Sequence, residues 1–144
     1  MTVRALLQNK GNFVSTVGPE TRVQEVMDQL ERDEVSALVV VGETGDILGI
    51  VSGGDVVRGL NRLGPEIVEK PVMDVMTSEV FTCDIAEPLS AIYELMDTNR
   101  IRHIPILEAN RLRGIVNTLD VVKYRLREIE NEAEALKEYV SGRT

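Results

Sequence analysis

Apolar positions along this chain follow a pattern that occurs twice. In the first copy four apolar residues are spaced i, i+3, i+4 and i+7, which predicts a helix with one buried face. These residues are Val23, Val26, Met27 and Leu30. Sixty-six residues further on, the same spacing returns in Leu89, Ile92, Tyr93 and Met96. The repeated spacing indicates an internal duplication.

Short apolar segments flank both predicted helices and predict strands. A β-favouring run precedes each helix, at residues 14–17 and 80–83. Two apolar runs joined by a polar turn follow each helix, at residues 38–41 and 47–51 and again at residues 104–107 and 112–116. Similar segments, Asp55-Val56-Val57-Arg58 and Asp120-Val121-Val122-Lys123, then begin a closing helix. Each copy therefore has the order strand, helix, strand, strand, helix.

Local signals also predict where two of the helices start. Thr21, with Gln24 three residues later, predicts a capping box at the first of these helices. In the second copy Pro88 is expected at the first helical position, where a missing backbone N–H does no harm.

The segments that lead into the two copies match as well, at residues 3–7 and 72–76. One such unit is too small to bury a good core alone, so the two copies are expected to pack face to face. We expect an α+β fold of two tandem β-α-β-β-α repeats. The first repeat covers residues 1–66 with its leading segment and linker, the second covers residues 67–126, and a helical extension covers residues 127–144.

Composition narrows the classes of function. The chain is 43% apolar and 28% charged, as in ordinary globular proteins. Its 24 acidic and 16 basic residues give a net charge of −8, which argues against nucleic acid as the main partner. No apolar run approaches the ~20 residues that cross a bilayer, and the N-terminus lacks the features of a signal peptide. We expect a cytoplasmic protein with no nucleic-acid or membrane partner.

Cys83 is the only cysteine, which excludes an internal disulfide and a cysteine-based metal site. It aligns with Val17 of the first copy, so we expect a small buried side chain. No cluster of metal ligands is apparent in the sequence, and no metal site is expected.

Four strings resemble the tandem cystathionine-β-synthase domain, known as the CBS pair or Bateman module. They are LVVV at residues 38–41 and GIVSGGD at residues 49–55, then RHIPI at residues 102–106 and GIVNTLD at residues 114–120. The resemblance covers roughly residues 1–126 and suggests a free-standing module with a C-terminal helix. It implies a pseudo-twofold pair of repeats whose clefts bind adenine nucleotides.

The resemblance also implies roles for single residues. In such modules the aspartate that ends the glycine-containing string holds the ribose, which points to Asp55 and Asp120, with Ser52 and Asn117 at the string's Thr/Ser position. An ionised carboxylate only accepts hydrogen bonds, so it suits two ribose hydroxyls. The positions before the second apolar strand often meet phosphate, which implies Arg102 and His103. Thr16 and Thr82 resemble positions that line the adenine and ribose pocket.

Each of these residues also has a structural explanation. Serine and asparagine are favoured N-caps, and a carboxylate in the first helical turn suits the helix dipole. Arginine and histidine at a strand end can simply be solvated, and threonine is a good strand former. The first copy has Ser36 and Ala37 where the second has Arg102 and His103. We therefore expect one cleft to carry less positive charge than the other.

The last helix is predicted to continue beyond what the repeat requires. Six residues form a heptad seam: Val122, Leu126, Ile129, Ala133, Leu136 and Val140. Two pairs of opposite charge flank the seam, Arg125 with Glu130 and Glu132 with Lys137. We expect a homodimer, and the alternative is a helix that folds back on its own subunit.

The sequence thus predicts a regulatory module that binds an adenine nucleotide and signals its level by a change of shape, with no catalytic residue. The ligand could be AMP, ADP, ATP, NAD or S-adenosylmethionine, no cofactor is required, and a further protein partner is possible. One alternative is a structural dimerisation scaffold with empty clefts. Another is an enzyme that acts on nucleotides with His103 as its base.

Overall fold

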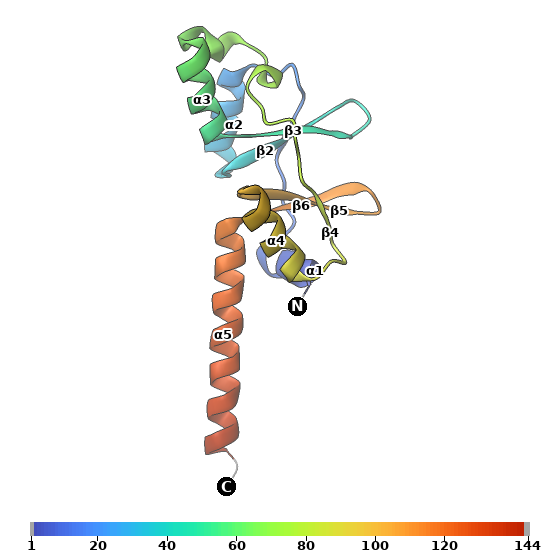
Figure 1. Cartoon of the computed structure of the whole chain (residues 1–144), viewed down its shortest axis with the longest axis vertical. Coiled ribbons are helices and arrows are strands. Elements are labelled where there is room, and N and C mark those ends of the chain that lie inside the picture. Colours follow the sequence, from blue (N-terminus) through green and yellow to red (C-terminus); the bar gives the residue numbers. More distant parts are fainter. Residues whose placement is uncertain (1, 143–144) are drawn as a thin grey trace.

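The computed structural model describes residues 2–142 and shows two β-α-β-β-α units (Figure 1). The first unit contains β1 (Thr16–Val17), α2 (Val23–Asp33), β2 (Ala37–Val41), β3 (Ile47–Ser52) and α3 (Gly53–Leu63). The second unit contains β4 (Cys83–Asp84), α4 (Leu89–Asn99), β5 (His103–Glu108), β6 (Arg111–Asn117) and α5 (Thr118–Ser141). A helix α1 (Val3–Lys10) precedes the first unit, and the short 3₁₀ helices η1 (Pro65–Glu69) and η2 (Val72–Asp74) connect the units. The predicted α+β duplication is confirmed.

The two units form separate three-stranded sheets with the same topology. In the first sheet β2 lies between β1 and β3, parallel to β1 and antiparallel to β3. In the second sheet β5 takes the same place between β4 and β6. The residues that end α2 and α4, Glu34 and Arg100, both adopt the left-handed conformation with φ of 53°. The backbone therefore repeats the duplication seen in the sequence.

Both predicted helix starts are wrong by one residue. Arg22 is the N-cap of α2, so the predicted Thr21–Gln24 capping box does not form. Pro88 is the N-cap of α4 instead of its first helical residue. At both starts a distant segment forms a β-bridge with the N-cap residue, in the pairs Arg22–Pro71 and Pro88–Thr2. This tertiary pairing outweighs the local capping signal.

Each unit completes its core with the segment that leads into the other unit. Val72 and Val75 pack with the buried residues of α2, β2 and α3. Val3, Leu6 and Leu7 of α1 pack instead with the core of the second unit. The repeat boundaries proposed along the chain stay a prediction, but in space the two leading segments are exchanged between the units.

A third apolar cluster joins the two sheets. Its buried members are Ala37, Val39, Ile50 and Ile115. Alternate residues of β2 belong to different cores, because Leu38 and Val40 pack under the helices of the first unit. Burial of both faces explains why this strand is an uninterrupted apolar run in the sequence.

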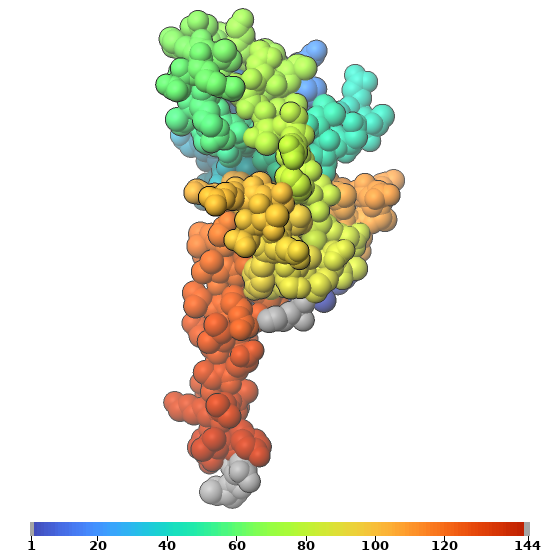
Figure 2. Space-filling model, viewed as in Figure 1, coloured from blue at the N-terminus to red at the C-terminus, as the bar shows by residue number. Residues whose placement is uncertain are grey.

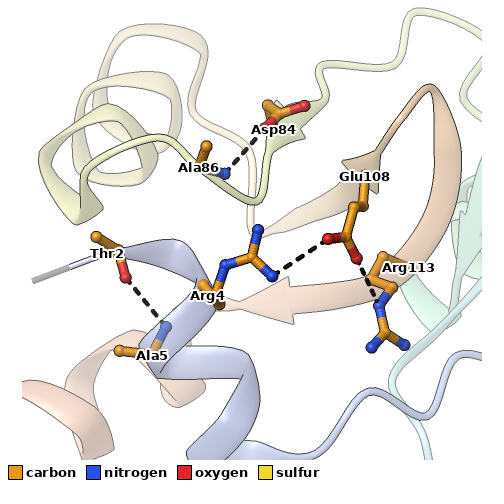
Figure 3. Close-up of polar contacts among 7 residues, drawn as sticks. All are labelled: Thr2, Arg4, Ala5, Asp84, Ala86, Glu108 and Arg113. Atoms are coloured by element: carbon orange, nitrogen blue, oxygen red, sulfur yellow. Dashed lines mark hydrogen bonds and ion pairs between the residues drawn. The ribbon is translucent and has the colours of Figure 1, made fainter.

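Polar contacts add to the docking of α1 on the second unit (Figure 3). The Thr2 hydroxyl caps the helix by accepting a hydrogen bond from the Ala5 backbone N–H at 3.2 Å. Arg4 donates to Glu108 at 3.2 Å, and Arg113 donates to the other oxygen of the same carboxylate at 2.9 Å. These two hydrogen bonds lower the pKa of the Glu108 carboxyl. Exposed ion pairs contribute little to stability, so the apolar contacts of α1 dominate its docking.

The last helix, α5, extends far beyond the second unit (Figures 1 and 2). Apolar residues of its seam are exposed, among them Leu126 and, in the extension, Ile129, Leu136 and Val140. The alternative that this helix folds back on its own subunit is therefore wrong for this chain.

Cys83 is buried, as predicted from its alignment with Val17. Burial raises the pKa of its thiol to about 11. Within residues 2–142, no helix is long and apolar enough to cross a membrane. The same part of the chain contains no group of three or more His, Cys, Asp or Glu side chains that could hold a metal ion.

The exchanged packing of α1 can be tested by shortening Leu6, which is 1% exposed in the core of the second unit. Leu6→Ala should lower the free energy of unfolding by about 2–5 kcal/mol, because it leaves a cavity in that core. Leu63→Ala, at an exposed position that ends α3, should change it by less than about 0.5 kcal/mol. Urea denaturation measures both. Equal small effects would mean that α1 is not docked in the second unit.

Candidate functional site

Two clefts form where the units meet. Cleft one, of about 580 Å³, is lined by the start of α3, by residues 77–81 except 78, and by residues 100–103 of the second unit. Cleft two, of about 330 Å³, is lined by residues 34–37, the start of α5 and the segment around the end of α1. Of the predicted residues, Ser52, Asp55, Arg102 and His103 line cleft one, while His103, Asn117 and Asp120 line cleft two.

The carboxylate of Asp55 lies at the N-terminus of α3 and is almost fully buried, at 5% exposure. One of its oxygens accepts hydrogen bonds from the backbone N–H of Ser52 at 2.8 Å and from the Ser52 hydroxyl at 3.1 Å. The other oxygen accepts from Thr77 at 2.8 Å and from Arg58 at 2.7 Å. All four hydrogen bonds of this carboxylate therefore come from the helix start, from Thr77 and from the cation of Arg58.

Asp120 occupies the matching place at the start of α5. It completes a capping box with Asn117, in which each residue's backbone N–H donates to the other's side chain at 2.8 Å. The oxygen bonded by Asn117 also accepts from the ammonium of Lys10, at 2.5 Å. Both aspartates therefore lie at a helix N-terminus, as predicted, and each is paired with a cation.

The structure distributes the basic residues unequally between the clefts. Arg102 and His103 lie in the cleft that contains Asp55, the aspartate of the other unit. Asp120 shares its cleft with Ser36 and Ala37, the residues that replace the basic pair in the first unit. Cleft one also contains Arg58 and Arg100, so it carries several cations against the carboxylates of Asp55 and Glu79.

His103 is shared by the two clefts. Its Nε2 lies 2.8 Å from the hydroxyl of Ser36, so a hydrogen bond joins the two units at this point. Burial lowers the pKa of His103 below its ordinary value near 6.5, an effect that Lys10 and Arg102 reinforce and that Asp55 and Asp120 oppose. The imidazole is therefore close to charges from both clefts, and a further anion nearby would favour its protonated form.

The structure does not bring Thr16 and Thr82 into the clefts. Thr16 lies in β1 and Thr82 directly precedes β4, both are exposed, and neither is among the lining residues of cleft one or cleft two. Their predicted place in the adenine and ribose pocket remains a prediction.

Sequence reasoning missed Thr77, Arg58 and Lys10, which bond directly to the two aspartates. Thr77 reaches Asp55 because its backbone N–H and carbonyl pair with Ile50 on β3, at 2.8 and 2.9 Å. The available signal for Thr77 and Lys10 was their place shortly after the two matching leading segments, at residues 72–76 and 3–7, and the two residues line opposite clefts.

Comparison with known protein families decides the relationship. The model of the CBS domain matches the chain twice, at residues 11–62 and 72–127. The chain belongs to the CBS domain family. Each match contains one of the two aspartates at a helix N-terminus, so both clefts are bounded by CBS repeats.

Relatives of the CBS module occur as small proteins and within enzymes. The chain is 32% identical over 124 residues to the mitochondrial CBS domain-containing protein CBSX3 of Arabidopsis thaliana. The alignment covers 83% of this chain and 60% of that protein. It is 31% identical over 110 residues to inosine-5′-monophosphate dehydrogenase of Aquifex aeolicus, covering 75% of this chain. Only 22% of that enzyme is matched, so the similarity concerns its CBS portion.

Solved structures share the architecture. The CBS-domain protein ATU1752 of Agrobacterium tumefaciens is 34% identical, with a TM-score of 0.82 over 87% of this chain and 99% of that one. More distant is PAE2072 of Pyrobaculum aerophilum, a CBS domain protein solved with AMP, at 20% identity and a TM-score of 0.74 over 83% and 89% of the chains. The CBS pair of MJ0100, solved with 5′-methylthioadenosine and S-adenosylmethionine, is 22% identical with a TM-score of 0.78 over 89% and 98%. At these identities the last two show the shared fold.

Proposed function

We propose that this chain is a regulatory module that binds an adenine nucleotide between its two repeats and has no chemistry of its own. The observation that supports it best is the pair of carboxylates at the N-termini of α3 and α5, each in a cleft built from both units. A carboxylate that only accepts hydrogen bonds suits two neighbouring ribose hydroxyls, and it repels phosphate.

In cleft one, Asp55 would bind the ribose and the phosphates would lie against Arg102 and His103. These two residues come from the unit opposite Asp55, so one ligand would contact both units. Arginine suits this role because its guanidinium bonds phosphate oxygens in a fork geometry. In cleft two, Asp120 would bind the ribose, with Ser52 and Asn117 supporting the two aspartates at their helix starts.

The ligand class rests on the clefts together with the two ligand-bound relatives. Both of those proteins hold compounds that contain an adenosine group, AMP in one and two sulfur-containing adenosine derivatives in the other. AMP, ADP, ATP, NAD and S-adenosylmethionine share this group, and the proposal covers them all.

Signalling would follow from the position of the clefts. A ligand that contacts both units favours one distance and angle between them, and it shifts the population toward the shape that it binds more tightly. We propose that this shape is read by a protein partner, and that the module acts in the cytoplasm.

Two alternatives differ from this proposal in what the clefts do. A dimerisation scaffold would leave both clefts without a ligand, so absence of binding to any adenine compound would favour it. An enzyme could use the hydrogen-bonded pair Ser36 and His103 as nucleophile and base. However, the hydrogen bonds found for Asp55 and Asp120 go to other groups, so neither carboxylate orients the imidazole.

We also propose that the module is a homodimer. A groove of about 1030 Å³ between α4 and α5 contains the apolar side chains of Tyr93, Met96, Val122 and Leu126, together with charged residues such as Asp97 and Arg125. It continues into the exposed seam of the α5 extension, and a long amphipathic helix alone in water is marginal. A second copy related by a twofold axis would cover the groove and the seam with its own groove and seam. The pairs Arg125–Glu130 and Glu132–Lys137 would then bring opposite charges together between the two copies.

The ribose assignment is tested by Asp55→Asn combined with Asp120→Asn, which keeps the size of both side chains and removes their charge. A charge-assisted hydrogen bond contributes about 1.5–3 kcal/mol, so AMP should bind at least about tenfold more weakly in calorimetry. Asp97→Asn, on the exposed surface of α4, is the control. Unchanged affinity and stoichiometry in the double variant would remove the ribose assignment.

The phosphate assignment is tested by comparing AMP with adenosine. Arg102→Gln and His103→Asn should each weaken the binding of AMP about tenfold and leave the binding of adenosine nearly unchanged, because only AMP carries the phosphate. Bound phosphate raises the pKa of His103 from its lowered value, so binding takes up a proton and AMP affinity should rise as pH falls through 6.5 and below.

The pH series needs its own control, because the phosphate of AMP titrates near the same pH. His103→Asn retains that titration and lacks the imidazole, so the difference between wild type and variant reports His103 alone. A variant that loses affinity for AMP and adenosine equally would contradict the phosphate role.

The dimer is tested on the α5 seam. Truncation after Arg127 removes most of the seam, and Ile129→Glu with Leu136→Glu brings charges into it. Either change should raise the dimer dissociation constant at least about tenfold. Asn131→Glu with Ala135→Glu adds the same residues off the seam and should have little effect. Sedimentation velocity over a dilution series measures all of them. A dissociation constant unmoved by the seam changes would mean that another protein covers α5.

A further inference from the structure

Lys10 connects the N-terminal helix to cleft two. It is the last residue of α1, and its ammonium lies 2.5 Å from the Asp120 carboxylate and also donates to the backbone carbonyl of Ile115. Its side chain is only 25% exposed. The carboxylate to which we assign the ribose is therefore bonded to a cation from another part of the chain.

The matching pair in cleft one is built differently. There Asp55 bonds to Arg58, which lies three residues later on the same helix and is 66% exposed. Most of the Arg58 side chain therefore already lies in solvent. The backbone of Lys10 is held in place, because Leu6 and Leu7 anchor its helix in the core of the second unit, so its ammonium moves only by rotation of its own side chain.

Lys10 is also a cation that only cleft two contains. The two leading segments match at an offset of 69 residues, which places Glu79 where the first segment has Lys10, so the second segment brings a carboxylate and no ammonium to cleft one. Cleft two in turn has Ser36 and Ala37 where cleft one has Arg102 and His103. Apart from the shared His103, Lys10 is the basic residue that lines cleft two, and Glu34 and Asp120 are its acidic residues.

We infer that Lys10 makes cleft two selective for nucleotides over nucleosides. When a nucleotide binds, the ammonium of Lys10 moves away from Asp120 and bonds to the ligand's phosphate, and Asp120 is then free to bind the ribose. The inference rests on the proposed function. The ribose hydroxyls need the carboxylate that Lys10 holds, and a charge-assisted hydrogen bond is not given up without a replacement. A phosphate offers that replacement, whereas an uncharged nucleoside leaves the ammonium without an anionic partner.

The surroundings favour movement of Lys10 into cleft two. Lys10 and Asp120 also line a cavity of about 210 Å³, where the other charged residues are Lys123 and Arg127, whose charges repel an ammonium. On the cleft side lies His103, which is close enough for Lys10 to lower and Asp120 to raise its pKa. A phosphate in cleft two therefore lies within the field of two donors, Lys10 and His103.

The experiment uses the full chain with Asp55→Asn, which weakens cleft one, and measures AMP and adenosine by calorimetry. Adding Lys10→Met should weaken the binding of AMP at least tenfold, because the phosphate loses its ammonium partner. The affinity for adenosine should stay the same or rise, because Asp120 is then free. The preference for AMP over adenosine should fall accordingly. Lys10→Arg should keep most of this preference. Lys70→Met, which removes the same charge at an exposed position outside both clefts, should leave the preference intact.

Each outcome can be assigned. A preference unchanged in Lys10→Met, or equal weakening of both ligands, overturns the role of Lys10 and leaves the proposed function standing. Loss of all binding in Asp55→Asn, with wild type still binding AMP, means that cleft two takes no nucleotide and also overturns the inference. Absence of binding in wild type overturns the proposed function itself. If Lys10→Met does not fold, as judged by circular dichroism, Lys10→Gln replaces it.

Discussion

The apolar layer between the two sheets is the contact from which the rest of the architecture follows. Ala37, Val39, Ile50 and Ile115 are buried there, while the opposite faces of the strands are covered by helices. A sheet of three strands cannot hide both faces within one small unit, so the second copy supplies the missing cover. Because the sheets meet face to face, the ends of β3 and β6 and the helices that follow them lie at the junction. The two clefts are formed at that junction.

Repetition in the sequence was enough to predict this architecture. The matched helical stripes and the paired apolar runs define the order of elements, and the buried run of β2 reflects burial on both faces. The exchange of leading segments was not predictable, because residues 3–7 and 72–76 are equally apolar. No local sequence signal indicates in which of the two cores each segment packs. The same exchange moved two helix starts, since the chain that bridges to Arg22 and Pro88 comes from far away in the sequence.

The candidate site, like the fold, could be predicted from the sequence only in part. The place of Asp55 and Asp120 at helix starts could be predicted because a carboxylate in the first helical turn leaves a local signature together with the preceding serine or asparagine. Their predicted ribose role came from the resemblance to CBS pairs. Their cations could not be predicted, because Lys10 reaches Asp120 across 110 residues and Arg58 is an unremarkable helix residue in the sequence. The unequal charge of the two clefts was expected from the sequence, but only the packing of the units places Arg102 and His103 opposite the aspartate of the other unit.

The central claim is that a nucleotide binds between the repeats, with its ribose on an aspartate at a helix N-terminus. A crystal structure of the chain grown with AMP tests this most directly. The account predicts AMP in cleft one or in both clefts, with its ribose hydroxyls within about 3 Å of Asp55 or Asp120 and, in cleft one, its phosphate against Arg102 and His103. AMP bound elsewhere, for example in the groove between α4 and α5, or with its phosphate against the aspartates, would contradict the account.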